Sequence, residues 1–194
     1  MISLHIERQA TYSRAQLVLR LLFGWLYIVL PHLILLSFVL LWAKILWLYA
    51  TFYILLKGEY PIKTKEYLIH GMRWLSRVHA SAYNLTDTYP KFGLNPEVDY
   101  LKLDFETKEP IDRLSVLVRF ILGSVLLIPH VFIWSFRNLW NSILVFVAFW
   151  VVLFTGKYPE KWFDFQVGTL RWLLRIVGYQ LYLVDQYPPF TGNE

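Results

Sequence analysis

Two histidines stand at equivalent places in two apolar stretches, and their chemistry suits the binding of a metal or a haem. The sequence reads Pro31-His32 in the first stretch and Pro129-His130 in the second. Ionisable side chains at membrane depth are costly and are therefore functional candidates, and two imidazoles brought together could ligate a haem iron or another metal. Alternatively, each imidazole hydrogen-bonds backbone groups that the proline leaves unpaired. Most buried polar groups in proteins have such a hydrogen-bond partner. We favour this alternative and expect no metal and no cofactor.

Two pairs of arginines are the second candidate for chemistry, because a guanidinium matches phosphate oxygens with a two-pronged hydrogen bond. They lie in a motif, Arg-Trp-Leu-x-Arg, that occurs twice. Contact with lipid headgroups or with a partner is one hypothesis; pairing with Asp87 and Asp185, or extension of the side chains to the membrane interface, is the other. The candidate contact residues are Arg73, Trp74, Arg77, Arg171, Trp172 and Arg175.

This motif is part of a repeat that covers essentially the whole chain. The motifs Gly-x-Tyr-Pro, Arg-Trp-Leu-x-Arg and Tyr-Pro-x-Phe recur at one constant separation, whereas the matches that precede them, such as Arg20 with Arg119, lie one residue further apart. A single insertion or deletion between Leu21 and Leu30 explains the difference. The sequence therefore predicts two tandem repeats, residues 1–95 and 99–194.

Glycine, tyrosine and proline residues of the repeat are predicted to form structural corners. Glycine suits the left-handed residue that ends a helix, and proline cannot continue one. Tyrosine is a common anchor at a membrane interface. The predicted corners are Gly58, Tyr60, Pro61, Tyr89, Pro90, Gly156, Tyr158, Pro159, Tyr187 and Pro188.

Two apolar runs, Leu17 to Leu56 and Leu114 to Phe154, dominate a chain of 194 residues that is 57% hydrophobic. Roughly 20 apolar residues span a bilayer, so each run is long enough for two passes. Polar residues near the middle of the second run (Arg137, Asn138 and Asn141) indicate a turn there. We predict helical hairpins over 15–57 and 114–155, with a re-entrant hairpin that does not reach the far side as the alternative.

Shorter elements flank each predicted hairpin. Apolar and polar residues alternate over Ile2–Glu7 and Leu101–Glu106, which is the pattern of a short strand, and we predict that the two strands pair with each other. Basic, aromatic-rich helices predicted over 65–85 and 161–184 would lie in the membrane interface. The predicted fold class is an all-α integral membrane protein of two tandem repeats, each a short strand, a transmembrane hairpin and an interfacial amphipathic helix.

The charge pattern predicts where the chain resides. The net charge is +5, and the basic residues flank the apolar runs, which favours anionic phospholipids over nucleic acid as the partner. By the positive-inside bias, both termini are predicted to be cytoplasmic in a multi-pass protein. The chain has no cysteine, which excludes disulfides and thiolate metal sites.

Several of these residues together resemble a known family. The series Phe154 to Pro159, Arg171-Trp172-x-x-Arg175 and Asp185-x-Tyr187-Pro188-Pro189-Phe190 resembles the bacterial membrane family catalogued as domain of unknown function 4389. The first copy departs from the pattern at Lys57-Gly58-Glu59 and at Lys91. The resemblance implies a protein of the bacterial inner membrane and implies no particular reaction.

The sequence contains no phosphate-binding loop and no Ser/His/Asp constellation in a credible context. We therefore expect a non-enzymatic protein, an accessory or scaffold subunit of a larger complex, with the bilayer, anionic phospholipids and integral-membrane proteins as partners. The alternative is a lipid-binding or transport-associated protein that uses the paired arginines. A haem-binding electron carrier is the third hypothesis.

Overall fold

The computed structural model describes residues 1–106 and 111–193. The described residues form, in order, β1 (Ile2–Ile6), α1 (Arg14–Gly24), the π-turn η1 (Trp25–Val29), α2 (Leu30–Lys57), α3 (Ile62–Ala82), β2 (Leu101–Phe105), α4 (Arg113–Thr155) and α5 (Glu160–Gln180). The order strand, long helix, shorter helix thus occurs twice. We call residues 1–95 the first half and residues 99–193 the second half.

Each apolar run is one continuous helix, so the predicted hairpins are wrong. The first helix runs from Arg14 to Lys57 through the π-turn, and the second from Arg113 to Thr155. The polar cluster in α4 does not break the helix because it contains no glycine or proline and because α5 supplies its partner: the Arg137 guanidinium donates to the Thr169 hydroxyl at 3.0 Å. Both helices are long and apolar enough to cross a membrane by length and composition.

The π-turn lies where the comparison of the two copies predicts one additional residue. Its closing hydrogen bond runs from the Leu30 N–H to the Trp25 carbonyl, a span of five residues in place of the usual four. The wider turn takes up one residue without changing the direction of the flanking helical faces. Arg20 and His32, on either side of it, are both buried as their counterparts Arg119 and His130 are.

The helix ends follow from local sequence. Ser13 and Asp112 cap the N-termini of α1 and α4 with their side-chain oxygens. Gly58 and Gly156, with φ of 79° and 71°, end α2 and α4 in the left-handed conformation that was predicted for them. The shorter helices occupy Ile62–Ala82 and Glu160–Gln180, so they begin directly after Pro61 and Pro159 and end earlier than predicted.

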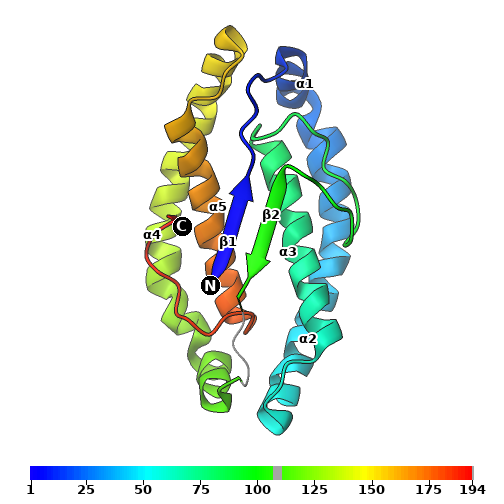
Figure 1. Cartoon of the computed structure of the whole chain (residues 1–194), viewed down its shortest axis with the longest axis vertical. Helices are drawn as coiled ribbons and strands as arrows, with labels where there is room; N and C mark the ends of the chain where they lie inside the picture. The colour runs from blue at the N-terminus through cyan, green and yellow to red at the C-terminus, as the bar shows by residue number, and fades with distance from the viewer. Residues whose placement is uncertain (107–110, 194) are drawn as a thin grey trace.

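The two strands pair, as predicted, in an antiparallel two-stranded sheet in which Leu4 lies opposite Leu103. The predicted repeat matches these two positions with each other. Figure 1 shows the sheet in front of the helices, α3 and α5 side by side behind it, and the two long helices running antiparallel along the outer edges. The main core lies where sheet, short helices and long helices meet.

The two halves also exchange backbone hydrogen bonds at both ends of the long helices. The Tyr12 N–H donates to the Gly156 carbonyl at 2.8 Å, and the Ile111 N–H donates to the Gly58 carbonyl at 3.3 Å. The start of each long helix is therefore tied to the end of the other. This arrangement gives the molecule two similar sides around the centre of the sheet.

Candidate functional site

Each predicted histidine lies in an enclosed cage formed by its own half. The ring of His32 is fully buried, and its Nδ1 accepts a hydrogen bond from Trp74 Nε1 at 2.9 Å. The ring of Phe92 stacks on the imidazole with 3.9 Å between centroids. Because Nδ1 is an acceptor, the neutral imidazole carries its proton on Nε2.

The second half repeats this cage. His130 is fully buried, its Nδ1 accepts from Trp172 Nε1 at 3.1 Å, and Phe190 stacks on the ring at 3.8 Å. The proline motif positions the phenylalanine, because the Tyr187 hydroxyl donates to the Leu126 carbonyl on the long helix at 2.7 Å. The tryptophans predicted as headgroup contacts are therefore partners of the histidines.

The cages do not favour metal or haem ligation. One nitrogen of each imidazole already accepts a hydrogen bond, one face of each ring is covered by phenylalanine, and neither residue is exposed. Within residues 1–106 and 111–193 no group of three or more His, Cys, Asp or Glu side chains is placed to hold a metal ion. The alternative of a core histidine agrees better with the geometry, although the donor to each Nδ1 is an indole and not the backbone, and each Nε2 is buried without a hydrogen-bond partner among the described residues.

We expect Trp172→Phe to lower the free energy of unfolding by about 1–3 kcal/mol, the usual cost of leaving a buried acceptor without its donor. The substitution keeps an aromatic ring and removes the indole N–H that His130 accepts. Thermal unfolding in mild detergent, followed by circular dichroism, measures the change. Trp140→Phe, at an exposed indole of α4, is the control, and an equal loss in both variants would contradict the cage.

The arginine pairs have hydrogen-bond acceptors inside the protein, which does not favour the headgroup hypothesis. Arg171 and Arg175 are buried, and both reach across to β1: Arg171 donates to the Leu4 carbonyl at 2.6 Å and Arg175 to the Ile2 carbonyl at 3.1 Å. In the first half, Arg73 donates to the Leu103 carbonyl of β2 at 3.0 Å. These guanidiniums link the short helices α3 and α5 to the strands and to the chain segments that follow each short helix.

Two further arginines, Arg20 and Arg119, were matched in the sequence but not singled out as site residues. Each is buried on a long helix and donates to carbonyls at the C-terminal end of the neighbouring short helix: Arg119 to Val184 at 2.8 Å, and Arg20 to Ser81 at 3.3 Å. A charged residue in the first turns of each predicted membrane segment was the available signal.

Tyr89-Pro90 and Tyr187-Pro188 are not the helix stops that were predicted. Helices α3 and α5 end at Ala82 and Gln180, ahead of both motifs. The left-handed residues Asn84 (φ 56°) and Tyr182 (φ 60°) terminate them, with the following N–H groups returning to carbonyls of the last turn. The two Tyr-Pro motifs instead place phenylalanine on histidine.

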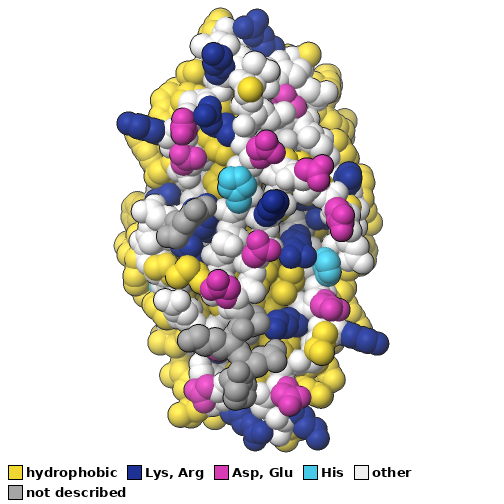
Figure 2. Space-filling model, in the orientation of Figure 1, with side chains coloured by type: hydrophobic (Ala, Val, Ile, Leu, Met, Phe, Trp, Pro, Cys, Tyr) yellow, Lys and Arg dark blue, Asp and Glu magenta, His cyan; other side chains and the backbone are white. Residues whose placement is uncertain are grey.

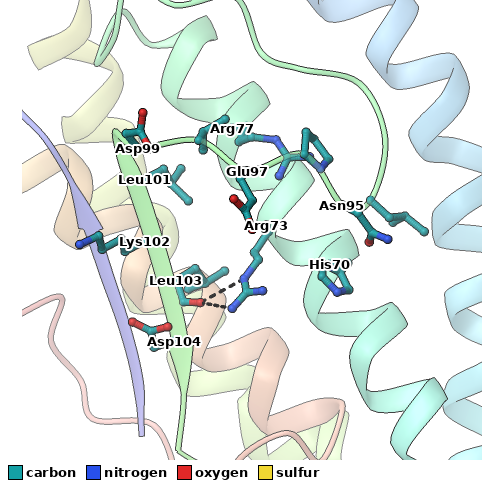
Figure 3. A pocket seen from close by; sticks show the side chains of 13 residues that line it. His70, Arg73, Arg77, Asn95, Glu97, Asp99, Leu101, Lys102, Leu103 and Asp104 are labelled. Carbon is teal, nitrogen blue, oxygen red and sulfur yellow. Dashed lines mark hydrogen bonds between the residues drawn. The ribbon is translucent and has the colours of Figure 1, made fainter.

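A polar pocket of about 380 Å³ opens beside β2 on the sheet side of the molecule (Figure 3). Arg73 and Arg77 of α3 line it together with Glu97 and Asp99 of the segment that leads into the strand. Burial lowers the pKa of the Arg77 guanidinium, and Arg77 donates to the Gly93 carbonyl at 2.6 Å. Cationic and anionic groups are mixed in this pocket, so it has no single sign of charge for an anion or a cation.

A second hollow of about 450 Å³ lies at the other edge of the sheet, beside β1. It is lined by Asp164 and Arg171 of α5 and by His5. Figure 2 shows charged side chains of both signs scattered over the whole sheet side, with hydrophobic side chains along the left and right edges. This face has the composition of a water-facing surface.

The long helices present the reverse composition. In the described part of the chain, all but six of the exposed large hydrophobic side chains belong to α1, η1, α2 and α4. Helix α4 buries only a narrow stripe and exposes apolar residues from Leu114 at one end to Phe154 at the other. An exposed apolar surface of this extent marks a contact with membrane or with protein.

No curated protein and no solved structure matches the chain. One family model matches the segment that contains α4, α5 and the second histidine cage. Residues 113–192 match the family described as Domain of unknown function (DUF4389), which supports the resemblance over that part of the chain.

Proposed function

We propose that this protein is a non-enzymatic membrane protein of two tandem repeats that lies in one leaflet and serves as an accessory or scaffold subunit. Its long helices lie in the plane of the membrane, and the sheet side faces the cytoplasm and the partner proteins. The observation that carries the proposal is the separation of the surface into an apolar set of long helices and a charged sheet side.

The length of the helices favours an in-plane orientation over an upright one. A helix of 44 residues is about 65 Å long, roughly twice the thickness of the hydrocarbon core. Its exposed apolar side chains run from Leu19 near the start to Leu56 near the end. An upright helix would therefore expose about half of this surface to water, whereas a helix that lies flat keeps all of it in lipid.

The place of the sheet supports the same orientation. Figure 1 shows the strands beside the middle of the long helices and not at their ends. Exposed charges of the strands, such as Lys102 and Asp104, would lie at the centre of the bilayer if the long helices stood upright. A charged side chain at that depth is expensive without a partner, so this orientation is strongly disfavoured.

Exposed basic residues at the two ends of the molecule, and not the arginine pairs, are the proposed contacts with anionic phospholipids. An in-plane molecule brings both ends to the same headgroup layer, where each exposed cation adds about 1 kcal/mol of attraction to an anionic surface. The residues are Arg14, Lys57, Lys63, Arg113, Lys157 and Lys161.

Single cysteines test the orientation cleanly because the chain has none of its own. We expect fluorescent labels at Leu22→Cys, Phe38→Cys and Leu56→Cys, all exposed apolar positions, to lie at one shallow depth, within about 10 Å of the headgroup boundary. Quenching by lipids that carry a nitroxide at defined depths measures this in reconstituted vesicles. A label at Lys102→Cys on the sheet is the water-exposed control.

An upright helix predicts a different result. The label at residue 38 would then lie deepest, and those at 22 and 56, about 50 Å apart along the helix axis, would lie near opposite surfaces. That graded pattern would overturn the single-leaflet proposal.

A further inference from the structure

A cavity of about 360 Å³ lies between α1, the π-turn and α4. Its volume is within the range of small-molecule sites, roughly 300–1,000 Å³. Its walls combine large apolar side chains with a few polar ones, which is the usual composition of such sites. The aromatic wall residues are Trp25, Phe146, Phe149 and Trp150, and the polar ones are Arg20, Asn84 and Ser142.

The equivalent place in the second half is filled by side chains. The sequence match puts Trp47 where the cavity has Val145, and Tyr182 where it has Asn84. The rings of Trp47 and Tyr182 stack with 6.1 Å between centroids, and Trp47 also packs on Phe120 at 5.7 Å. The cavity of the first half therefore results from two smaller side chains at positions that the fold can fill with aromatic rings.

The charge at this cavity also differs from that of its counterpart. Arg119 pairs with the Asp185 carboxylate at 3.1 Å. In the first half the Asp87 carboxylate accepts instead from the Ser13 N–H at 2.7 Å, and Arg20 donates only to backbone carbonyls.

Arg20 is thus a buried cation with no ion-pair partner among the described residues, and its Nε atom has no hydrogen-bond partner there. A buried cation without a carboxylate is costly, so an anion that enters beside it gains a charge-assisted hydrogen bond.

The π-turn adds an independent observation, since such turns are frequent at functional sites. Its first residue, Trp25, forms part of the cavity wall and is 65% exposed. Phe146, on the facing side of α4, is also 65% exposed. The cavity therefore reaches the apolar outer face of the long helices, the direction from which a lipid chain would enter.

We propose that this cavity binds one amphiphile with a single apolar chain and an anionic head, either a carboxylate or a phosphate. The head lies at the Nε atom of Arg20, and the chain follows the aromatic wall towards the apolar face. This site is additional to the membrane contact proposed above. Its test is carried out in detergent, so failure here and failure of the in-plane orientation are separate results.

Native mass spectrometry of the full chain in a mild non-ionic detergent provides the first test, and it needs no variant. The probes are oleate, oleoyl-lysophosphatidylglycerol and oleyl alcohol, which share one chain and differ in the head. We expect one anionic amphiphile per chain, bound about tenfold or more tightly than the alcohol, because a charge-assisted hydrogen bond contributes at least that factor. The stronger binder of the two anions identifies a carboxylate or a phosphate as the head.

A matched pair of variants locates the site. Val145→Trp places in the cavity the side chain that fills the second half, and we expect it to reduce binding of the stronger anionic probe about tenfold or more. Val147→Trp adds the same ring at an exposed position of α4 and should bind as the unsubstituted chain does, with circular dichroism confirming that both variants are folded. Unchanged binding of the stronger anionic probe by a folded Val145→Trp, or an affinity for both anionic probes no higher than for oleyl alcohol, would overturn the proposal.

Discussion

Arg119→Met is expected to lower the free energy of unfolding by about 3–5 kcal/mol, the cost of breaking a buried ion pair by removal of one partner. The Arg119 side chain is fully buried and joins α4 to the end of α5. It pairs with Asp185 at 3.1 Å and donates to the Val184 and Tyr179 carbonyls at 2.8 and 3.2 Å. Methionine fills part of the volume but supplies no donor to these three acceptors, so α5 loses its link to the long helix.

Denaturant or thermal unfolding in mild detergent, followed by circular dichroism, measures this loss. Lys161→Met removes a cation from an exposed position of α5 and should change stability by less than about 0.5 kcal/mol. If the two substitutions had the same small effect, Arg119 would not be the link between the helices that the contacts indicate.

The double substitution Arg171→Gln with Arg175→Gln is expected to lower the free energy of unfolding by about 3–6 kcal/mol, since each hydrogen bond from a charged group contributes roughly 1.5–3 kcal/mol. Both side chains reach from α5 to carbonyls of β1. Glutamine is shorter and neutral, so it cannot keep these bonds across the same gap. We expect β1 to separate from α5 before the helices unfold.

Limited proteolysis near the N-terminus, together with the unfolding midpoint, detects the release of the strand. Arg73→Gln is the comparison in the first half. The Arg73 side chain is partly buried and donates to a single strand carbonyl, so its loss should have a smaller effect. Binding of the folded fraction to anionic vesicles should be unchanged in both variants. A selective loss of vesicle binding without loss of stability would restore the headgroup hypothesis for these arginines.

Several elements could be predicted because their causes are local or periodic. The alternating residues of Ile2–Glu7 and Leu101–Glu106 predicted strands, and the repeat suggested that they pair. Gly58 and Gly156 were predicted helix ends because a left-handed residue favours glycine. The single extra residue between Leu21 and Leu30 also has a local cause, and a π-turn in that interval agrees with it.

The predicted hairpins failed for a reason that lies outside the apolar runs. Polar residues in the middle of a long apolar segment suggest a turn when the segment is considered alone. In the folded chain, Arg137 bonds to Thr169 and stacks 4.0 Å over Phe165 of α5. The helix therefore continues, because a partner from another element satisfies the polar side chain.

By itself, the sequence determined the membrane-like composition, the repeated motifs and the identity of the residues worth testing, because these depend on residue type and spacing alone. Tertiary structure decided what those residues do. The acceptor of Arg171 is the carbonyl of Leu4, at the other end of the chain, and the donor to His130 is Trp172 on the next helix. Only the folded chain shows that one half is filled by Trp47 and Tyr182 while the other has a cavity beside Arg20, since packing volume depends on which elements meet.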